Sequence, residues 1–488
     1  MKAYPRIKNF LLLLLLTSLA MLVQGYHPGA EDDGVYLAAI KHNLNPELFP
    51  LDADFFKVQL QATIFDKVVA GSIRLTHLPA GEMILLWQFV SVFLILWGCL
   101  RISRRGFAES HAQWAAVGLV GALLTLPVSG SALYLDDQYL HPRALATAAI
   151  LAAVVAVLDR RKILAGFLLA LAFVIHPLMA GLGISLCVFL AWRVPVERFA
   201  LAALAAVPLG WIFQPTSPAW QQAAATRDYY FLSRWQWYEW FGVIAPLFLL
   251  WWFHRLGRND GSTVQAHVAL RLALFGSFQL IIAVCVMLPS SLDRLKPFQP
   301  MRYLHILYFL MFLLAGGLVG QKVLRRHAYR WLLLFIPLGF GMFWAQRATF
   351  PATQHMEWPG AKPGNSWVEG FEWIRHNTPV DSYFALDPHY MALPGEDFHS
   401  FRALAERSVL ADYVKDAAVA TQVPSLSVRW KDEVDAQDNW RSFQAADFQR
   451  LKSRFGVNWV VLAQPGPSGM DCPFENHAVR VCRIPEAN

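Results

Sequence analysis

The sequence predicts an α-helical, polytopic membrane protein of about eleven transmembrane helices, ending in a small α/β domain. Hydrophobic residues make up 56% of the 488 residues. They gather in apolar runs, each about as long as the roughly 20 residues needed to cross a bilayer, and short basic clusters separate the runs. From about residue 350 the composition becomes that of a soluble domain. We therefore divide the chain into a membrane domain, 1–349, and a C-terminal domain, 350–488.

The lysines and arginines set the predicted topology. The clusters at 101–105, 160–162 and 322–330 fall in segments that we assign to the cytoplasm, so the positive-inside rule places the N-terminus inside and the C-terminal domain outside. Segment 163–192 is interpreted as a hairpin of two short helices, because basic residues flank both of its ends, at 160–162 and at Arg193. A single crossing there would invert everything downstream. The predicted crossings are about 9–25, 80–100, 111–130, 142–158, 163–175, 178–192, 199–213, 240–253, 268–288, 303–320 and 331–349.

The net charge of +7 is a topology signal rather than a nucleic-acid footprint. The basic excess belongs to residues 1–350, and no Lys/Arg block is interleaved with aromatic residues, so we expect no nucleic-acid partner. Residues 1–20 have the basic start and leucine run of a signal peptide, but no small-x-small cleavage site follows. We expect an uncleaved first helix with a cytoplasmic N-terminus.

Three adjacent acids, Glu31, Asp32 and Asp33, directly follow the first apolar run. Carboxylates this close repel one another, and charge near hydrocarbon is costly, so the cluster favours a functional role. The alternative is an acidic helix start, which explains one acid well and three poorly. The rest of this external loop, 26–79, predicts a helix at 53–75 capped by Asp52. Its apolar residues recur every fourth position, so it lies on the membrane surface or packs against the bundle.

The second external loop repeats the acidic theme with Asp136 and Asp137. Pro142 suits the first turn of the next helix, whose positive end and Arg143 would face outward, a plausible phosphate site. Arg302, at another helix entrance, and Arg234, in an aromatic-rich loop at 214–239, are further candidates for binding phosphate. Most of the rings in that loop are expected to belong to an interfacial aromatic belt.

The C-terminal domain follows a linker rich in proline and glycine. Its pattern predicts helices at 367–377, 403–414 and 445–455 and strands at 383–386, 458–463 and 478–483, an alternation typical of a small α/β fold. Cys472 and Cys482 flank a possible hairpin and are expected to form a disulfide. The domain's histidines lack metal-ligand spacing and are interpreted as ordinary surface or core residues.

The two acidic pairs and the basic residues of the external loops are predicted to lie on the same side of the membrane and to form one site. Carboxylates accept protons or bind metal ions, and arginine binds phosphate. With Glu31-Asp32-Asp33-Gly34-Val35-Tyr36 in a long first loop, Asp136-Asp137 in the second, the helix count and the C-terminal external domain, the chain resembles the GT-C superfamily of membrane glycosyltransferases. That superfamily includes protein O-mannosyltransferases and aminoarabinose transferases.

The resemblance implies transfer of a sugar from a polyprenyl-phosphate carrier to an extracytoplasmic acceptor, by a multi-pass protein of a bacterial-type inner membrane with a periplasmic C-terminal domain. Asp33 would be the base or acceptor-orienting carboxylate, with Asp32 as the alternative. Asp137 would be the second acid, sharing a divalent metal with Asp33 if one is used. Arg143 and Arg302 would hold the carrier phosphate. We expect Asp33 and Asp137 to face one cavity.

Two features depart from the family pattern. Related O-mannosyltransferases carry Asp-Glu where this chain has Asp32-Asp33. The Trp-Trp-Asp signature of oligosaccharyltransferases is absent from the sequence, so transfer of a whole oligosaccharide is not expected. A transporter, and a non-catalytic envelope or assembly protein on the same scaffold, remain as alternative functions. The strongest acids fall at span ends rather than inside spans, which disfavours the transporter.

Overall fold

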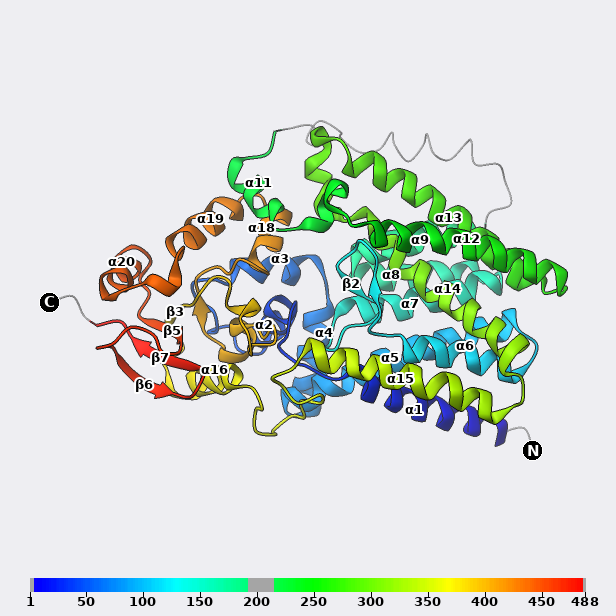
Figure 1. The fold of residues 1–488 in the computed structure, drawn as a ribbon, viewed down its shortest axis with the longest axis horizontal. Helices are drawn as coiled ribbons and strands as arrows, with labels where there is room; N and C mark the ends of the chain where they lie inside the picture. Colours follow the sequence, from blue (N-terminus) through cyan, green and yellow to red (C-terminus); the bar gives the residue numbers. More distant parts are fainter. Residues whose placement is uncertain (1–3, 192–214, 486–488) are drawn as a thin grey trace.

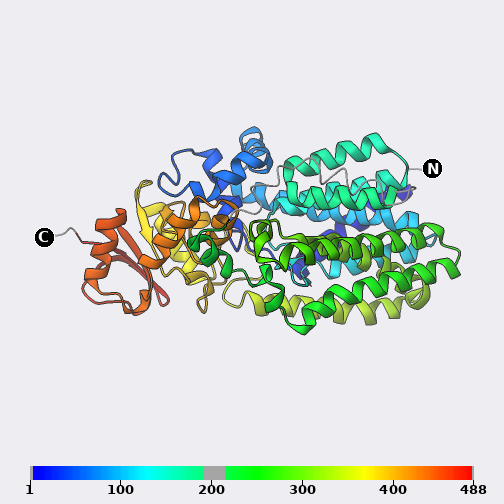
Figure 2. The same cartoon turned by 90° about the horizontal axis from the view of Figure 1, so that it is seen from above.

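The computed structural model describes residues 4–191 and 215–485. Long helices form a bundle at one end of the molecule, and a C-terminal α/β domain lies at the other end (Figure 1). The same division is visible in the perpendicular view of Figure 2. The short helices of the first loop lie between the two parts, where they contact both.

The bundle is built from apolar helices with a continuous hydrophobic core. Five helices of the described chain are long and apolar enough to cross a membrane, as expected of a multi-pass membrane protein. These candidate spans are Ile7–Gln24, Ala80–Gly106, Thr263–Met287, Pro300–Leu324 and Ala328–Thr349. The bundle helices are α1 (Tyr4–Gln24), α5 (Ala80–Gly106), α6 (Ser110–Ala122), α7 (Pro142–Leu158), α8 (Lys162–Ile175), α9 (Pro177–Ala191), α12 (Trp237–Asn259), α13 (Thr263–Met287), α14 (Tyr303–Val319) and α15 (Ala328–Thr349).

Most predicted crossings within the described residues coincide with one of these helices, although the number of crossings stays a prediction. Segment 163–192 contains two helices, α8 and α9, which meet at His176 and pack against each other. The predicted crossing 111–130 is wrong in its second half. There α6 ends at Ala122, and a hairpin of β1 (Pro127–Val128) and β2 (Leu133–Tyr134) follows. The predicted crossing 199–213 lies outside the described residues.

The first loop contains three helices, α2 (Asp33–Leu44), α3 (Asp54–Ala62) and α4 (Phe65–Thr76). The single helix expected at 53–75 is therefore wrong, because Thr63 is extended (φ −134°, ψ 166°) and breaks it. Asp52 does not cap α3 through its side chain. Its carboxylate instead accepts from Arg402 Nε at 2.8 Å and from the backbone N–H of Val409, both in the C-terminal domain.

The C-terminal domain is organised around a five-stranded sheet in the order β4-β3-β5-β7-β6. β4, β3 and β5 are parallel, whereas β7 and β6 add antiparallel strands. Successive residues of a strand face opposite sides. Phe384 accordingly packs with helix α16, and its neighbour Tyr383 belongs to the core beneath α20. The strands are β3 (Tyr383–Ala385), β4 (Ser408–Val409), β5 (Trp459–Ala463), β6 (Asp471–Glu475) and β7 (Val479–Arg483).

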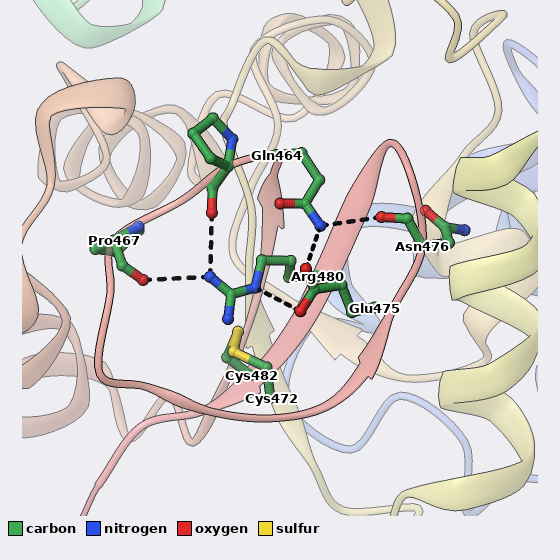
Figure 3. The surroundings of a disulfide bond; sticks show 8 residues. Gln464, Pro467, Cys472, Glu475, Asn476, Arg480 and Cys482 are labelled. Atoms are coloured by element: carbon green, nitrogen blue, oxygen red, sulfur yellow. Dashed lines mark hydrogen bonds and ion pairs between the residues drawn. A yellow bond between two sulfur atoms is a disulfide. The ribbon is translucent and has the colours of Figure 1, made fainter.

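A disulfide between Cys472 and Cys482 joins β6 to β7, with the Cα atoms 3.9 Å apart (Figure 3). Near the disulfide, Arg480 of β7 donates to the carbonyl oxygen of Pro465 and pairs with Glu475 of β6. Gln464 donates to Glu475 and to the Asn476 carbonyl. The two cysteines that the sequence pairs are therefore bonded at the edge of the sheet.

The helices of this domain agree only partly with expectation. α16 (Ser366–Asn377) and α20 (Ala445–Phe455) lie where they were predicted. The helix expected at 403–414 is wrong. α17 (Phe401–Ala405) stops because Glu406 adopts a left-handed conformation (φ 55°), and the chain then pairs with β3 as β4. Two helices that the sequence analysis missed follow, α18 (Asp416–Gln422) and α19 (Leu426–Ala436).

Candidate functional site

A cavity of about 1120 Å³ lies where the bundle, the first loop and the C-terminal domain meet. Its lining comes from widely separated parts of the sequence: α2 and α3 of the first loop, the β1–β2 hairpin, α12, α14 and α18. The charged residues of the lining come from loops and helix starts, which we call the charged end, whereas many of its apolar residues lie further along α12 and α14, which we call the apolar end. The charged residues of the lining are Glu31, Asp32, Asp137, Arg143, Arg227, Glu239, Arg302 and Lys415.

The first acidic cluster divides its three side chains between the cavity and the protein interior. Glu31 and Asp32 line the cavity, but Asp33, the expected base, does not. The Asp33 carboxylate is buried and accepts a hydrogen bond from the backbone N–H of Gly29 at 2.7 Å. The structure therefore brings Asp32, the alternative in the sequence analysis, to the cavity and encloses Asp33 behind it.

The two neighbouring carboxyls have opposite electrostatic environments. Burial raises the pKa of Asp33 to about 8, against the Gly29 hydrogen bond, and the charge of Asp32 adds to the increase. Burial alone would also raise the pKa of Asp32. The charge of Lys415 and the contact with His141 outweigh burial and hold the pKa of Asp32 well below its usual value. At neutral pH, Asp32 is therefore ionised, whereas most Asp33 carboxyls carry a proton.

Asp32 is held from two sides by residues that the sequence analysis did not select. Lys415 Nζ donates to Asp32 Oδ1 at 3.0 Å and also pairs with Glu31. His141 Nε2 lies 3.6 Å from Asp32 Oδ2. Lys415 stands at the start of α18, where Asp412 Oδ1 accepts its backbone N–H. The C-terminal domain thus builds one wall of the cavity, which no local pattern in the sequence indicates.

The second acidic loop is neutralised by a nearby arginine. Arg143 Nη2 donates to both carboxylate oxygens of Asp137, at 2.7 and 2.5 Å. His141 Nδ1 lies 3.9 Å from Asp137 Oδ2, so His141 stands between the two acidic loops. The charge of Asp137 also raises the pKa of Asp33. The two acidic loops therefore meet at the cavity, but the expectation that Asp33 faces it together with Asp137 is wrong, because Glu31 and Asp32 line it in place of Asp33.

Asp136, the other acid of the second loop, is buried and does not line the cavity. Gln24 Nε2 donates to its carboxylate at 3.4 Å, and burial together with the charge of Asp137 raises its pKa to about 8. Two buried glutamines, Gln24 and Gln88, also donate to the backbone carbonyl of Asp137, Gln88 at 2.9 Å. This network fixes the turn that carries Asp137.

Three arginines line the cavity, and two of them have buried donors without a partner among the described residues. Arg143 Nε and Nη1 and Arg227 Nε and Nη2 are buried and have no hydrogen-bond partner among the described residues. Arg302 lines the same cavity and donates through Nε to Gln299 Oε1 at 2.5 Å. Arg227 is a further residue that the sequence analysis missed. Arg234, by contrast, does not line the cavity, and it pairs with Asp228 at 2.7 Å on the surface.

The apolar end of the cavity runs along two bundle helices. Phe241, Ala245 and Leu249 of α12 face it on one side, and Met311 and Phe312 of α14 on the other. Because α14 begins beside Arg302, the apolar surface continues directly from the cationic end. A molecule with an anionic head and a hydrocarbon tail would match both ends at once.

The residues do not fit a resident metal ion. Asp137 is occupied by Arg143, and Asp33 accepts the Gly29 N–H away from the cavity. In residues 4–191 and 215–485, no group of three or more His, Cys, Asp or Glu side chains is placed to hold a metal. The proposed sharing of a metal by Asp33 and Asp137 therefore has no support in this geometry, and no step is derived through one.

No protein-family model matches the chain, and a comparison with curated proteins found no similar sequence.

Proposed function

We propose that this protein is a membrane glycosyltransferase that moves a sugar from a polyprenyl-phosphate carrier to an acceptor on the extracytoplasmic side of the membrane. The observation that carries the proposal is the division of the cavity into a cationic, acid-containing end and an apolar end beside α12 and α14. A lipid-linked sugar phosphate has the complementary parts, namely an anionic phosphate, a polar sugar and a hydrocarbon tail.

Arg143, Arg227 and Arg302 are the proposed phosphate ligands. Arg143 and Arg227 have buried guanidinium donors without partners among the described residues, which is costly, and a phosphate oxygen satisfies them with charge-assisted hydrogen bonds; Arg302 lines the same cavity. Asp137 fixes the direction of Arg143 by accepting two contacts from one of its nitrogens, which leaves the remaining donors for the ligand. The tail would lie against Phe241, Leu249 and the neighbouring apolar lining.

Asp32 is the proposed base. As the acceptor hydroxyl oxygen bonds to the anomeric carbon, the bond from that carbon to the phosphate oxygen breaks. The hydroxyl proton passes to Asp32, and the carrier leaves as polyprenyl phosphate, whose charge the arginines stabilise. Asp32 is ionised at neutral pH and faces the cavity, so it can accept a proton there.

The test is transfer by the purified protein in lipid nanodiscs, with labelled sugars on polyprenyl phosphate as donors and released polyprenyl phosphate as the readout. Asp32→Asn should lower kcat at least about 100-fold, because a base contributes that much to a proton transfer, with little change in donor binding. Asp33→Asn is the matched control. It replaces a carboxyl that is already mostly protonated and does not line the cavity, so its loss should be much smaller.

Two results would overturn the proposal. One is absence of donor binding and turnover across a panel of carriers and sugars, which would leave the non-catalytic scaffold as the better interpretation. The other is counterflow of a labelled solute in proteoliposomes that survives Asp32→Asn, which would identify a transporter. Equal losses in Asp32→Asn and Asp33→Asn would reject the assignment of the base to Asp32.

A further inference from the structure

His141 connects the two acidic loops, and its two ring nitrogens have different partners. Nδ1 accepts the backbone N–H of Arg143 at 2.9 Å and so caps the start of α7. A nitrogen that accepts a hydrogen bond carries no proton, so the proton of the neutral ring resides on Nε2. The helix cap therefore selects the tautomer.

The protonated nitrogen faces Asp32. Nε2 lies 3.6 Å from Asp32 Oδ2, slightly longer than a hydrogen bond, while Lys415 Nζ takes the other oxygen, Oδ1. Contacts of this kind are often long without substrate and shorten in the reacting complex. The two oxygens of the Asp32 carboxylate therefore have different partners: His141, at the start of a bundle helix, lies near Oδ2, and Lys415 of the C-terminal domain donates to Oδ1.

The surroundings leave the ring little freedom to turn. His141 is 1% exposed, and the Tyr36 ring packs against it edge-on with the ring centres 4.5 Å apart. Tyr139 and His176 lie with their ring centres 6.1 Å away. The charged groups near it are Asp32, Asp137 and Arg143. A ring flip would place Cδ2–H, which cannot accept a hydrogen bond, against the Arg143 N–H, and the cap would be lost.

We propose that His141 is a positioning residue that, as the Nε2–H tautomer, orients the Asp32 carboxylate toward the acceptor hydroxyl. The proposal rests on the proposed function for its role in turnover, but the tautomer and its contact with Asp32 do not depend on that function. His141 keeps its own proton throughout. The proton of the acceptor hydroxyl passes to Asp32, and His141 only donates a hydrogen bond to that carboxylate.

Two substitutions separate this role from helix capping. Asparagine is a good N-cap, so His141→Asn keeps an acceptor for the Arg143 N–H but is too short to reach Asp32. His141→Gln extends an amide N–H toward the position of Nε2. We expect His141→Asn to lower kcat about 10- to 100-fold with an unchanged KM for the donor and an unchanged melting temperature. His141→Gln should recover part of kcat.

A measurement without turnover completes the test. ¹⁵N NMR of the histidine-labelled protein in nanodiscs, assigned by the signal lost in His141→Asn, should give the Nε2–H tautomer for His141. Asp32→Asn should shift that signal, whereas Asp33→Asn should leave it in place. An Nδ1–H tautomer, or an unchanged signal in Asp32→Asn, would overturn the proposal whether or not the protein transfers sugar. Wild-type kcat in His141→Asn, with transfer established, would also overturn it. If the wild-type protein transfers no sugar but the NMR results are as expected, the proposed function is wrong and the positioning of Asp32 by His141 still stands.

Discussion

Gln88 supports the cavity from inside the bundle. Its side chain is 1% exposed and donates to the Asp137 carbonyl at 2.9 Å, so it fixes the turn whose carboxylate directs Arg143. We predict that Gln88→Leu raises the KM for the donor about 10-fold, because a misdirected Arg143 binds phosphate less well. Gln265→Leu is the matched control. That glutamine is equally buried, but both of its amide atoms lack a partner in the described structure, so donor KM should stay constant.

Only part of the candidate site could be predicted from the sequence. Asp32 and Asp137 could be selected because ionised carboxylates close to hydrocarbon are costly, and Arg143 and Arg302 because they stand at external helix entrances. The sequence could not decide between Asp32 and Asp33. Which neighbour faces a cavity depends on how Gly29 and the loop turn, and no periodicity reports that. Lys415 lies 382 positions after Asp33 in the chain, and only tertiary structure places it beside Asp32.

Glycines determine how closely α14 approaches α6. A Cβ at Gly316 would lie 2.7 Å from the Ala115 carbonyl oxygen, and one at Gly320 would lie 2.8 Å from the Ala112 Cα. Because these neighbours are backbone atoms, they cannot move aside. We predict that Gly316→Ala destabilises the protein by about 1–3 kcal/mol, measured by denaturant titration. Gly341→Ala, in α15, meets nothing within 4 Å and should be neutral or slightly stabilising. Equal stability of the two variants would contradict this account of the packing.

The local sequence pattern predicts some helices and strands correctly and others wrongly. α20 has strong helical periodicity, β5 is a short continuous apolar run, and both lie where expected. The helix expected at 403–414 failed because tertiary contacts override its high helix propensity. Arg407 is buried and donates to the Thr378 hydroxyl and the Thr378 carbonyl, and the next two residues pair with β3. Eleven crossings remain a prediction, since charge segregation gives sidedness but not the depth of each helix.

Buried ion pairs attach the C-terminal domain to the first loop and to the segment that follows α1. Arg402 binds Asp52 of the first loop and Asp416 of α18, all within the interior. A second cluster links the end of α1 to the linker and the domain. There Glu357 Oε1 accepts from His27 at 2.7 Å and from His399 at 3.3 Å. The cavity wall that carries Lys415 depends on this attachment.

The second cluster predicts a pH-dependent attachment. Burial lowers the pKa of His399, but the charge and hydrogen bond of Glu357 outweigh burial and raise it overall from 6.5. A raised pKa means that protonated His399 stabilises the folded state. This stabilisation is complete below the unfolded pKa near 6.5 and is lost as pH rises through the folded value.

Breaking a buried pair costs roughly 3–5 kcal/mol. His399→Gln should therefore destabilise the protein by about that amount at pH 6 and by less at pH 9, measured by denaturant titration. His376→Gln, an exposed histidine of the same domain, is the control and should have little effect at either pH. A penalty for His399→Gln that does not depend on pH would mean that His399 packs as a neutral ring, and the attachment would then not respond to pH.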